Sequence, residues 1–265
     1  MDFLKKLMRR VLNKVLRIFK SVYFKIFEAR VECNICGWQD FHFISDGWHP
    51  NSICPNCYSQ VRQRLFIGIL QNLKEFNINT ILKNKRILHF APDKGLVKII
   101  KSYAKFYETA DLLAEGYSYS DINFNMDMTN MKDIKDNEYD CVIAFDVLEH
   151  IPNHLDAIKE ANRILKKGGY CIFTVPQKDG LENTIEDLTI TDPKERERLF
   201  GQWDHWRIYG SDFKQMIADK GFDVHVLDEK IIDKKIVKKN VLFPPILSKH
   251  PLATNYRKVY FGVKK

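Results

Sequence analysis

One stretch decides the fold of this chain: DNEYDCVIAFDVLEHIPNHLDAIKEANRILKKGGYCIFTVP, residues 136–176. Its apolar runs at 141–145 and 171–175 have the length and composition of buried strands. Between them, residues 154–167 follow Pro152, precede two glycines and repeat apolar side chains at helical spacing. A buried strand, a helix and a second buried strand in this order predict a parallel β-α-β unit.

Similar short apolar runs recur on both sides of this unit, mostly separated by segments of helical periodicity. The expected strands cover residues 87–90, 106–110, 122–126, 141–145, 171–175, 224–227 and 259–263. Amphipathic helices are expected from Val61 to Leu73 and from Ser211 to Gly221, with a polar link at 77–85. Strands that alternate with helices predict an α/β fold, whose seven-stranded, mostly parallel sheet is covered on both faces.

Composition places the chain among ordinary globular proteins. Of its 265 residues, 45% are hydrophobic and 29% are charged, which excludes disordered and low-complexity classes. No apolar run approaches the ~18 residues of a membrane span. The net charge of +8 is concentrated in residues 1–30, which carry nine Lys and Arg residues against two acidic ones. A nucleic-acid partner is therefore less favoured, because phosphate binding needs clustered cations.

Residues 1–30 form an expected helix of their own. Its apolar positions recur at spacings of three and four: Leu4, Leu7, Met8, Val11, Leu12, Val15, Ile18, Phe19, Val22 and Ile26. Basic residues occupy the opposite face, a pattern typical of helices that lie on an anionic membrane surface. The alternative is an apolar stripe that packs on the body of the protein or on a second subunit. We expect a cytoplasmic protein that can associate with the inner face of the membrane.

Two CxxC pairs follow this helix. Cys33 and Cys36 form the first pair, and Cys54 and Cys57 form the second. Four thiolates at this spacing complete the tetrahedral shell of a structural zinc ion. Residues 31–60 are therefore expected to be a zinc ribbon, whose folding depends on Zn²⁺. Metal ligation in place of disulfides indicates a reducing compartment.

Acidic side chains follow several predicted strands. Asp111 follows the second strand, Asp127 the third and Asp146 the fourth, while the first strand ends in the loop from Phe90 to Gly95. Ligands of open parallel sheets bind at the carboxyl ends of the strands. A carboxylate after the second strand can accept hydrogen bonds from both ribose hydroxyls of a nucleoside, and Asp127 can accept from an adenine amino group.

Residues 136–176 resemble the fourth strand, helix and fifth strand of class I S-adenosylmethionine-dependent methyltransferases, particularly the methyltransferase-11-like group. The resemblance covers roughly residues 86–228. It extends to a subgroup with a zinc-ribbon-like N-terminus, an APE-type first loop and a late DHVR-like motif, here Asp204-His205-Trp206-Arg207. That subgroup is often associated with surface-polysaccharide biosynthesis. The resemblance implies a Rossmann-like domain, S-adenosylmethionine as cofactor and a glycan or other small polar acceptor.

The resemblance also implies where the cofactor binds. The implied residues are Phe90, Ala91, Asp93, Gly95, Asp111, Asp127, Met128 and Phe145. The family usually has an acidic residue followed by G-x-G-x-G in the first loop, whereas this chain has His89, Ala91, Asp93 and Gly95 there. Asp93 is expected to receive the methionine ammonium in place of the missing acid. The altered loop leaves a catalytically inactive binding module as an alternative.

Catalytic candidates lie in two segments. After the fourth strand and in the later insertion they are Asp146, Glu149, His150, Asp204, His205 and Arg207. A hydroxyl acceptor must lose its proton, so carboxylates and imidazoles are candidate bases or acceptor-positioning groups. The insertion at 181–210 is expected to form an acceptor lid, because its Asp, Arg, His and Trp residues suit a polar ligand. Arg207 could instead form a structural ion pair, with Asp187 or Asp204.

These observations favour O-methylation of a glycan or other small polar acceptor. The expected organisation is a basic helix at 1–30, a zinc ribbon at 31–60, a linking helix at 61–85 and a methyltransferase domain at 86–265. One alternative is an RNA methyltransferase that grips nucleic acid with the ribbon, although the base-stacking Asn/Asp-Pro-Pro-aromatic loop is lacking after the fourth strand. A second is a non-catalytic zinc-ribbon scaffold. No oligomeric state is predicted.

Overall fold

The computed structural model describes residues 30–45, 48–113 and 122–265, together with positions 8, 11, 12, 14, 15 and 19. The basic helix predicted for residues 1–30 therefore lies largely outside the described residues. The six isolated positions are helical, and the apolar side chains among them are more than half exposed. Among the described residues, no helix combines the length and hydropathy needed to span a bilayer.

A seven-stranded sheet forms the centre of the molecule. Its strands are β3 (Arg86–Phe90), β4 (Phe106–Asp111), β5 (Phe124–Asn125), β6 (Tyr139–Phe145), β7 (Leu165–Thr174), β10 (Phe222–Leu227) and β11 (Val259–Lys264). Their order is β10-β11-β7-β6-β3-β4-β5. The five strands from β7 to β5 are parallel, and β11 lies antiparallel between β7 and β10. The predicted Rossmann-like α/β sheet is confirmed.

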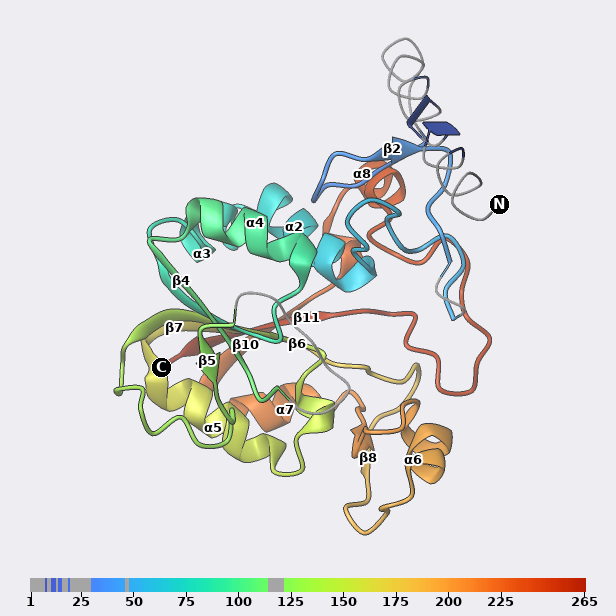
Figure 1. The fold of residues 1–265 in the computed structure, drawn as a ribbon. Helices are drawn as coiled ribbons and strands as arrows, with labels where there is room; N and C mark the ends of the chain where they lie inside the picture. Colours follow the sequence, from blue (N-terminus) through green and yellow to red (C-terminus); the bar gives the residue numbers. More distant parts are fainter. Residues whose placement is uncertain are drawn as a thin grey trace.

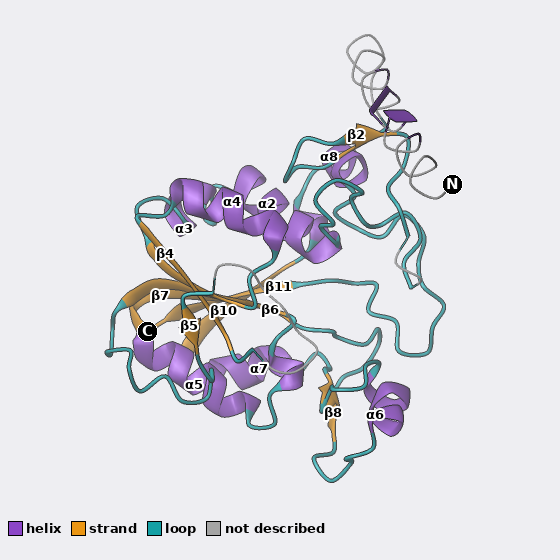
Figure 2. Cartoon of the chain, viewed as in Figure 1, coloured by secondary structure: helices purple, strands orange, loops and turns teal. Residues whose placement is uncertain are grey.

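Helices cover both faces of the sheet (Figures 1 and 2). One layer contains α2 (Val61–Asn72), α3 (Ile78–Ile81) and α4 (Lys94–Tyr103), and the other contains α5 (His154–Ile164) and α7 (Phe213–Ala218). Successive β6 side chains alternate between the two cores, as the pleat requires: Ile143 packs with the α2 layer and Val142 with the α5 layer. The helix α2, expected as a link, is thus part of the layer that covers the sheet.

Two local expectations were wrong. The helix predicted to run to Lys167 ends at Ile164, because Leu165 takes an extended conformation (φ −75°, ψ 143°) and pairs with Tyr139 as the first residue of β7. The polar link at 77–85 contains the short helix α3. Its N-cap is Asn77, whose side chain accepts hydrogen bonds from two backbone N–H groups of the first turn.

The N-terminal ribbon packs against a late part of the chain. It contains the antiparallel pair β1 (Val31–Glu32) and β2 (Gln39–Asp40). Between β10 and β11, the chain forms the 3₁₀ turn η2 (Glu229–Ile231) and helix α8 (Lys234–Asn240). The Asn240 side-chain amide donates to the Glu32 carbonyl at 2.9 Å, and Val241 is buried among the ribbon cysteines. The ribbon is therefore attached to the body through α8, which the sequence did not predict.

The insertion after β7 forms a small unit beside the sheet (Figure 1). Its short strands β8 (Ile185–Glu186) and β9 (Arg207–Ile208) pair antiparallel, and helix α6 (Pro193–Phe200) lies between them in the chain. The backbone N–H of Trp206 donates to the carbonyl of Glu149 at 3.0 Å. Glu149 belongs to the 3₁₀ turn η1 (Leu148–His150), so the insertion is fixed to the loop that follows β6.

Candidate functional site

The carboxyl ends of β3, β4 and β6 lie side by side because these strands are parallel neighbours. Just beyond the strands, Ala91 and Asp146 take left-handed conformations (φ 46° and 51°) that turn the chain out of the sheet. Phe90 and Phe145 are 2% exposed and pack in the cores, as does Met128. These three predicted cofactor residues are therefore core residues.

Asp93 begins α4 and is held by the start of α2. Its Oδ1 accepts from the Gln63 side-chain amide at 2.8 Å, and Arg62 lies 3.9 Å from the same oxygen. The other oxygen, Oδ2, is buried and accepts no hydrogen bond from the described residues. Burial raises the pKa of Asp93. An ammonium or another donor placed here would satisfy the second oxygen.

Asp146 is the centre of an ion-paired cluster. Arg62 and Arg257 each lie 3.2 Å from its Oδ2, and the Thr174 hydroxyl donates to its Oδ1 at 2.8 Å. Burial acts to raise the pKa of Asp146, but Arg257 and Arg62 outweigh it and the pKa is lowered. A carboxylate held so firmly in its ionised form is poorly suited to accept a proton, which favours a binding or positioning role over a catalytic one.

The two acids expected to hold the nucleoside differ. Asp111 is partly buried, which raises its pKa, and its Oδ1 accepts from the Leu113 backbone N–H at 2.6 Å. Asp127 is exposed, and its Oδ1 accepts from the backbone N–H and the hydroxyl of Thr129, both at 2.8 Å. The Asp111 carboxylate also interacts electrostatically with His150. Asp111 is thus the better placed of the two to face the site.

Gly95 and His89 contact other parts of the fold. A Cβ on Gly95 would lie 3.5 Å from the Ile35 side chain and 3.7 Å from the Cys57 carbonyl, so this glycine contacts the ribbon. His89 is buried, and its Nδ1 lies 2.9 Å from the Tyr107 hydroxyl. Burial lowers the pKa of His89 to about 3, which leaves the imidazole neutral. His89 therefore replaces the family acid with an uncharged core residue.

A second group of ionisable side chains lies where η1 meets the insertion. His150 Nδ1 is 3.0 Å from Asp204 Oδ2, and the rings of His150 and His205 are 4.7 Å apart in a T-shaped contact. Burial acts to lower the pKa of His150, but the Asp204 hydrogen bond and the negative charges of Glu149, Asp204 and Asp146 together outweigh burial, and the pKa is raised. Burial lowers the pKa of His205 to about 4 and, with Asp146, raises that of Glu149 to about 7. The loop after β6 and the insertion, which carry the catalytic candidates, therefore meet at this group.

Arg207 has the structural role that the sequence left open as an alternative, with Glu186 as its acidic partner in place of Asp187 or Asp204. Its side chain is fully buried, and its guanidinium donates to the carbonyls of Leu148, Ile151 and Pro152 at 2.6–2.8 Å. Its Nε also donates to the Glu186 carboxylate. With each guanidinium nitrogen engaged, Arg207 fastens the loop after β6 to the insertion and does not present a donor to an acceptor.

A family model described as a methyltransferase domain matches residues 59–226. The match covers more than half of the chain and runs from β3 into β10, with the strand ends and the insertion described above. This chain belongs to the methyltransferase domain family. The predicted class I S-adenosylmethionine-dependent methyltransferase is thereby confirmed.

Individual proteins match this methyltransferase either over a short segment or at low sequence identity. A 58-residue segment is 49% identical to an uncharacterized protein of Methanocaldococcus jannaschii; it covers 21% of this chain and 25% of that protein. The chain thus spans about a quarter of the length of this curated relative. A crystal structure of an S-adenosylmethionine-dependent methyltransferase from Mesorhizobium loti is 12% identical, with a TM-score of 0.47, and covers 69% of this chain and 92% of its own. A crystal structure of one from Archaeoglobus fulgidus is 12% identical, with a TM-score of 0.46; the match covers 71% of this chain and 89% of that one.

The four N-terminal cysteines of the methyltransferase lie together. Sγ of Cys33 is 3.6 Å from Sγ of Cys57, Sγ of Cys36 is 3.6 Å from Sγ of Cys54, and all four sulfurs lie within 4.8 Å of one another. A tetrahedral zinc ion with Zn–S bonds of about 2.3 Å separates its ligand sulfurs by about 3.8 Å. The predicted ligand set therefore has dimensions that fit zinc.

Arg64 supports this fit. Its guanidinium is fully buried beside the sulfurs, and in the described part of the chain it donates only to backbone carbonyls and to the Ser59 hydroxyl. Burial lowers the pKa of Arg64 to about 10, while the four thiolates act to raise it. A buried cation needs a negative partner. Four thiolates around Zn²⁺ carry a net charge of −2 and would provide one.

Sequence reasoning missed three residues of the methyltransferase site: Arg62, Arg257 and Thr174, which surround Asp146. Arg62 lies in the predicted linking helix, and Arg257 follows a long segment without a recognisable pattern. Nothing local in the sequence marks either arginine as part of the site.

Proposed function

We propose that this methyltransferase transfers the methyl group of S-adenosylmethionine to a hydroxyl oxygen of a small polar acceptor of the glycan type. The observation that carries the proposal is the group Glu149, His150 and His205, which the insertion brings together next to the end of β6. An amine acceptor has a nucleophilic lone pair once it is neutral, whereas a hydroxyl must lose its proton for efficient attack. Buried carboxylate and imidazole groups are suited to removing the proton from a hydroxyl acceptor.

The strand ends have the donors and acceptors that the cofactor requires. S-adenosylmethionine supplies an electrophilic methyl group on a sulfonium. The buried Oδ2 of Asp93 would accept from the methionine ammonium, Arg62 would bind the methionine carboxylate, and Asp111 would hold the ribose hydroxyls. In this proposal Asp127 would accept from the adenine amino group, and the backbone from Ala91 onward would line the methionine end.

Transfer then depends mainly on position. The acceptor oxygen loses its proton with the help of the Glu149, His150 and His205 group and forms a bond to the methyl carbon as the carbon–sulfur bond breaks. The electron pair of that bond goes to sulfur, which leaves S-adenosylhomocysteine and a methyl ether. In-line positioning of the two reactants supplies most of the acceleration. Arg207 acts as a positioning residue because it holds the loop that carries Glu149 and His150.

The insertion also offers an aromatic surface next to this group. The Trp203 side chain is 47% exposed and directly precedes Asp204, the partner of His150. An exposed indole face beside hydrogen-bonding groups suits the apolar face and hydroxyls of a sugar ring. This feature, with the subgroup resemblance, favours a glycan acceptor.

The cysteine cluster is proposed to hold a structural Zn²⁺. Four protein thiolates leave no open position for a substrate, which is the arrangement of structural sites. Its role is to fold residues 31–60 against α8 and the start of α4.

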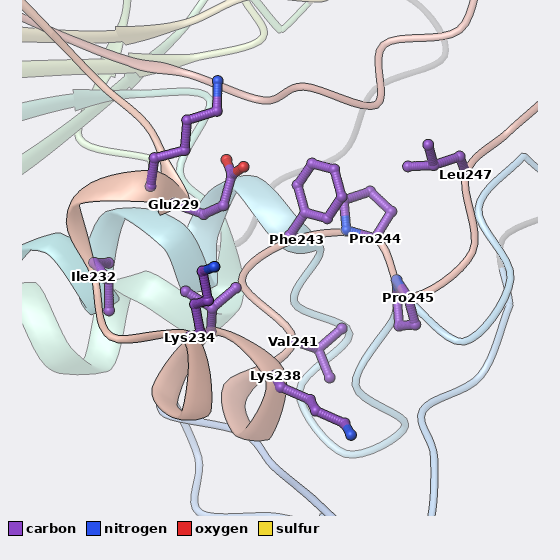
Figure 3. A pocket seen from close by; sticks show the side chains of 11 residues that line it. Glu229, Ile232, Lys234, Lys238, Val241, Phe243, Pro244, Pro245 and Leu247 are labelled. Carbon is purple, nitrogen blue, oxygen red and sulfur yellow. The ribbon is translucent and has the colours of Figure 1, made fainter.

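An anionic membrane surface is the proposed partner of residues 1–30. The described body contributes a groove of about 490 Å³ beside α8, and α8 contacts the β1 strand that follows these residues. Figure 3 shows apolar Phe243 and Pro244 on one side of the groove and Lys234 and Lys238 on α8. An apolar floor with a basic rim suits the acyl chains and headgroups of anionic lipid. Co-sedimentation with anionic but not zwitterionic vesicles tests this partner.

Two measurements test the proposed reaction. Calorimetric titration with S-adenosylhomocysteine should give one binding event per chain, and labelled methyl transfer to lysate fractions should mark the glycan fraction. Label in RNA or protein would overturn the acceptor class while leaving the cofactor assignment intact. Failure to bind S-adenosylhomocysteine would overturn the cofactor site.

A further inference from the structure

The Glu149, His150 and His205 group has the composition and dimensions of a metal site. One carboxylate oxygen and one ring nitrogen from each histidine lie within 4.8 Å of one another. Glu149 is 1% exposed and His205 is 7% exposed, while the His150 side chain is 25% exposed. The group is thus mostly buried but open to solvent on the His150 side.

Hydrogen bonds fix the tautomer of both histidines. His150 Nδ1 lies 3.0 Å from a carboxylate oxygen of Asp204, and His205 Nδ1 lies 3.1 Å from the Phe200 carbonyl oxygen. An ionised carboxylate and a carbonyl can only accept, so each neutral imidazole carries its proton on Nδ1 and its lone pair on Nε2. Metal-binding histidines usually have this arrangement, in which a carboxylate or carbonyl orients the ring from behind.

The Glu149 carboxylate gives an independent indication of a missing partner. Its Oε2 is buried, and no donor among the described residues reaches it. Arg257 acts electrostatically on Glu149, but its guanidinium is ion-paired with Asp146. A buried carboxylate oxygen without a donor is costly, and a cation is one of the few groups that can compensate it.

We propose that Glu149, His150 and His205 bind a divalent transition-metal ion, with positions left open for oxygens of the acceptor. Two imidazoles and one carboxylate are a ligand set used by catalytic zinc and by other first-row divalent ions. Its part in catalysis rests on the proposed methyl transfer: a hydroxyl bound to the ion becomes more acidic and releases its proton to water before its oxygen attacks the methyl carbon. Formation of the site itself does not depend on that reaction.

Cobalt(II) titration of the full chain, purified with zinc in its cysteine cluster, tests the site. We expect one equivalent of Co²⁺ to bind and to produce weak visible ligand-field bands. Cobalt that entered the cysteine cluster would produce intense thiolate charge-transfer absorption, which separates the two sites. Glu149→Gln and His205→Gln should each weaken binding of Co²⁺ at least tenfold. His225→Gln, a histidine on β10 outside the group, is the matched control and should bind Co²⁺ as the parent protein does.

Thermal unfolding and S-adenosylhomocysteine titration of the same variants show whether each variant is folded and binds cofactor. A folded, cofactor-binding parent that takes up no Co²⁺ outside the cysteine cluster would overturn the metal site and leave the proposed transfer in place. Equal Co²⁺ binding by the parent and by a folded Glu149→Gln variant would also overturn it. Co²⁺ bound with the expected variant dependence in a protein that binds no cofactor would support the site and overturn the proposed function.

Discussion

Two clusters of ligand-type side chains differ in how the chain assembles them. The four cysteines come from one stretch of 25 residues, and their sulfurs lie within 4.8 Å of one another. Glu149, His150 and His205 reach the same proximity from segments more than 50 residues apart, held by the insertion. The first cluster is local, and with the proposed zinc bound it would stabilise its own segment. The second depends on the rest of the fold, so its loss should affect reactivity before stability.

The largest effect is expected from a substitution that breaks the cysteine cluster. Cys54→Ser should lower the free energy of unfolding by on the order of 5 kcal/mol, because the proposed zinc would supply folding free energy to a segment with little core of its own. Glu149→Gln keeps the side-chain volume and should change it by less than about 1 kcal/mol. Chemical unfolding with metal analysis measures both. Similar losses of unfolding free energy in the two variants would contradict the distinction between a stabilising cluster and a reactive one.

Arg207→Lys is expected to disturb the group of Glu149, His150 and His205. Lysine cannot reproduce the planar set of bonds to the Leu148, Ile151 and Pro152 carbonyls, so about 2–3 kcal/mol of stability should be lost. Because η1 then moves, the turnover number should fall at least about tenfold. Steady-state kinetics and thermal unfolding check these outcomes. An unchanged melting temperature with a raised acceptor KM would restore Arg207 to the acceptor site.

Asp111 and Asp127 give a sharper comparison, since their positions after successive strands suggest similar roles. Asp111→Asn should weaken S-adenosylhomocysteine binding about 10- to 100-fold, equivalent to about 1.4–2.7 kcal/mol. Asp127→Asn should weaken it by less than about threefold, because Asp127 is exposed and its Oδ1 already bonds to Thr129. Calorimetric titration measures both affinities. A larger loss for Asp127→Asn would reverse this ranking.

Low pH should lower the free energy of unfolding through His89, which belongs to neither cluster. Unfolded His89 takes up a proton below about pH 6.5, whereas the folded imidazole stays neutral to about pH 3. Its folded pKa is depressed, so stability is full above pH 6.5 and falls as the pH drops toward 3. Between pH 7 and 5 the loss from His89 is about 2 kcal/mol.

His89→Asn removes this titration and retains a hydrogen-bonding group near Tyr107. Its unfolding free energy, measured at both pH values, should vary correspondingly less with pH than that of the parent. An identical pH slope for the two proteins would show that His89 is not responsible.

The fold was predictable from the sequence to the extent that the information is local. Strand runs such as 141–145, the helix that follows and the cysteine spacing are short-range patterns, and each appears in the structure. The helix end at Ile164 was missed because pairing of Leu165 with Tyr139 overrides helical propensity. Arg62 and Arg257 were missed because only the folded sheet brings them to Asp146.

The ribbon packs directly against the loop after β3 at Gly95. A methyl group at this glycine would contact the Ile35 side chain, and the Cys57 carbonyl lies just beyond. Helix α4 begins at this contact. If the cysteines hold zinc as proposed, loss of the metal would therefore remove the support behind the loop proposed to receive the methionine end of the cofactor. Zinc scarcity would then silence methylation from a distance, without altering any group that handles the methyl itself.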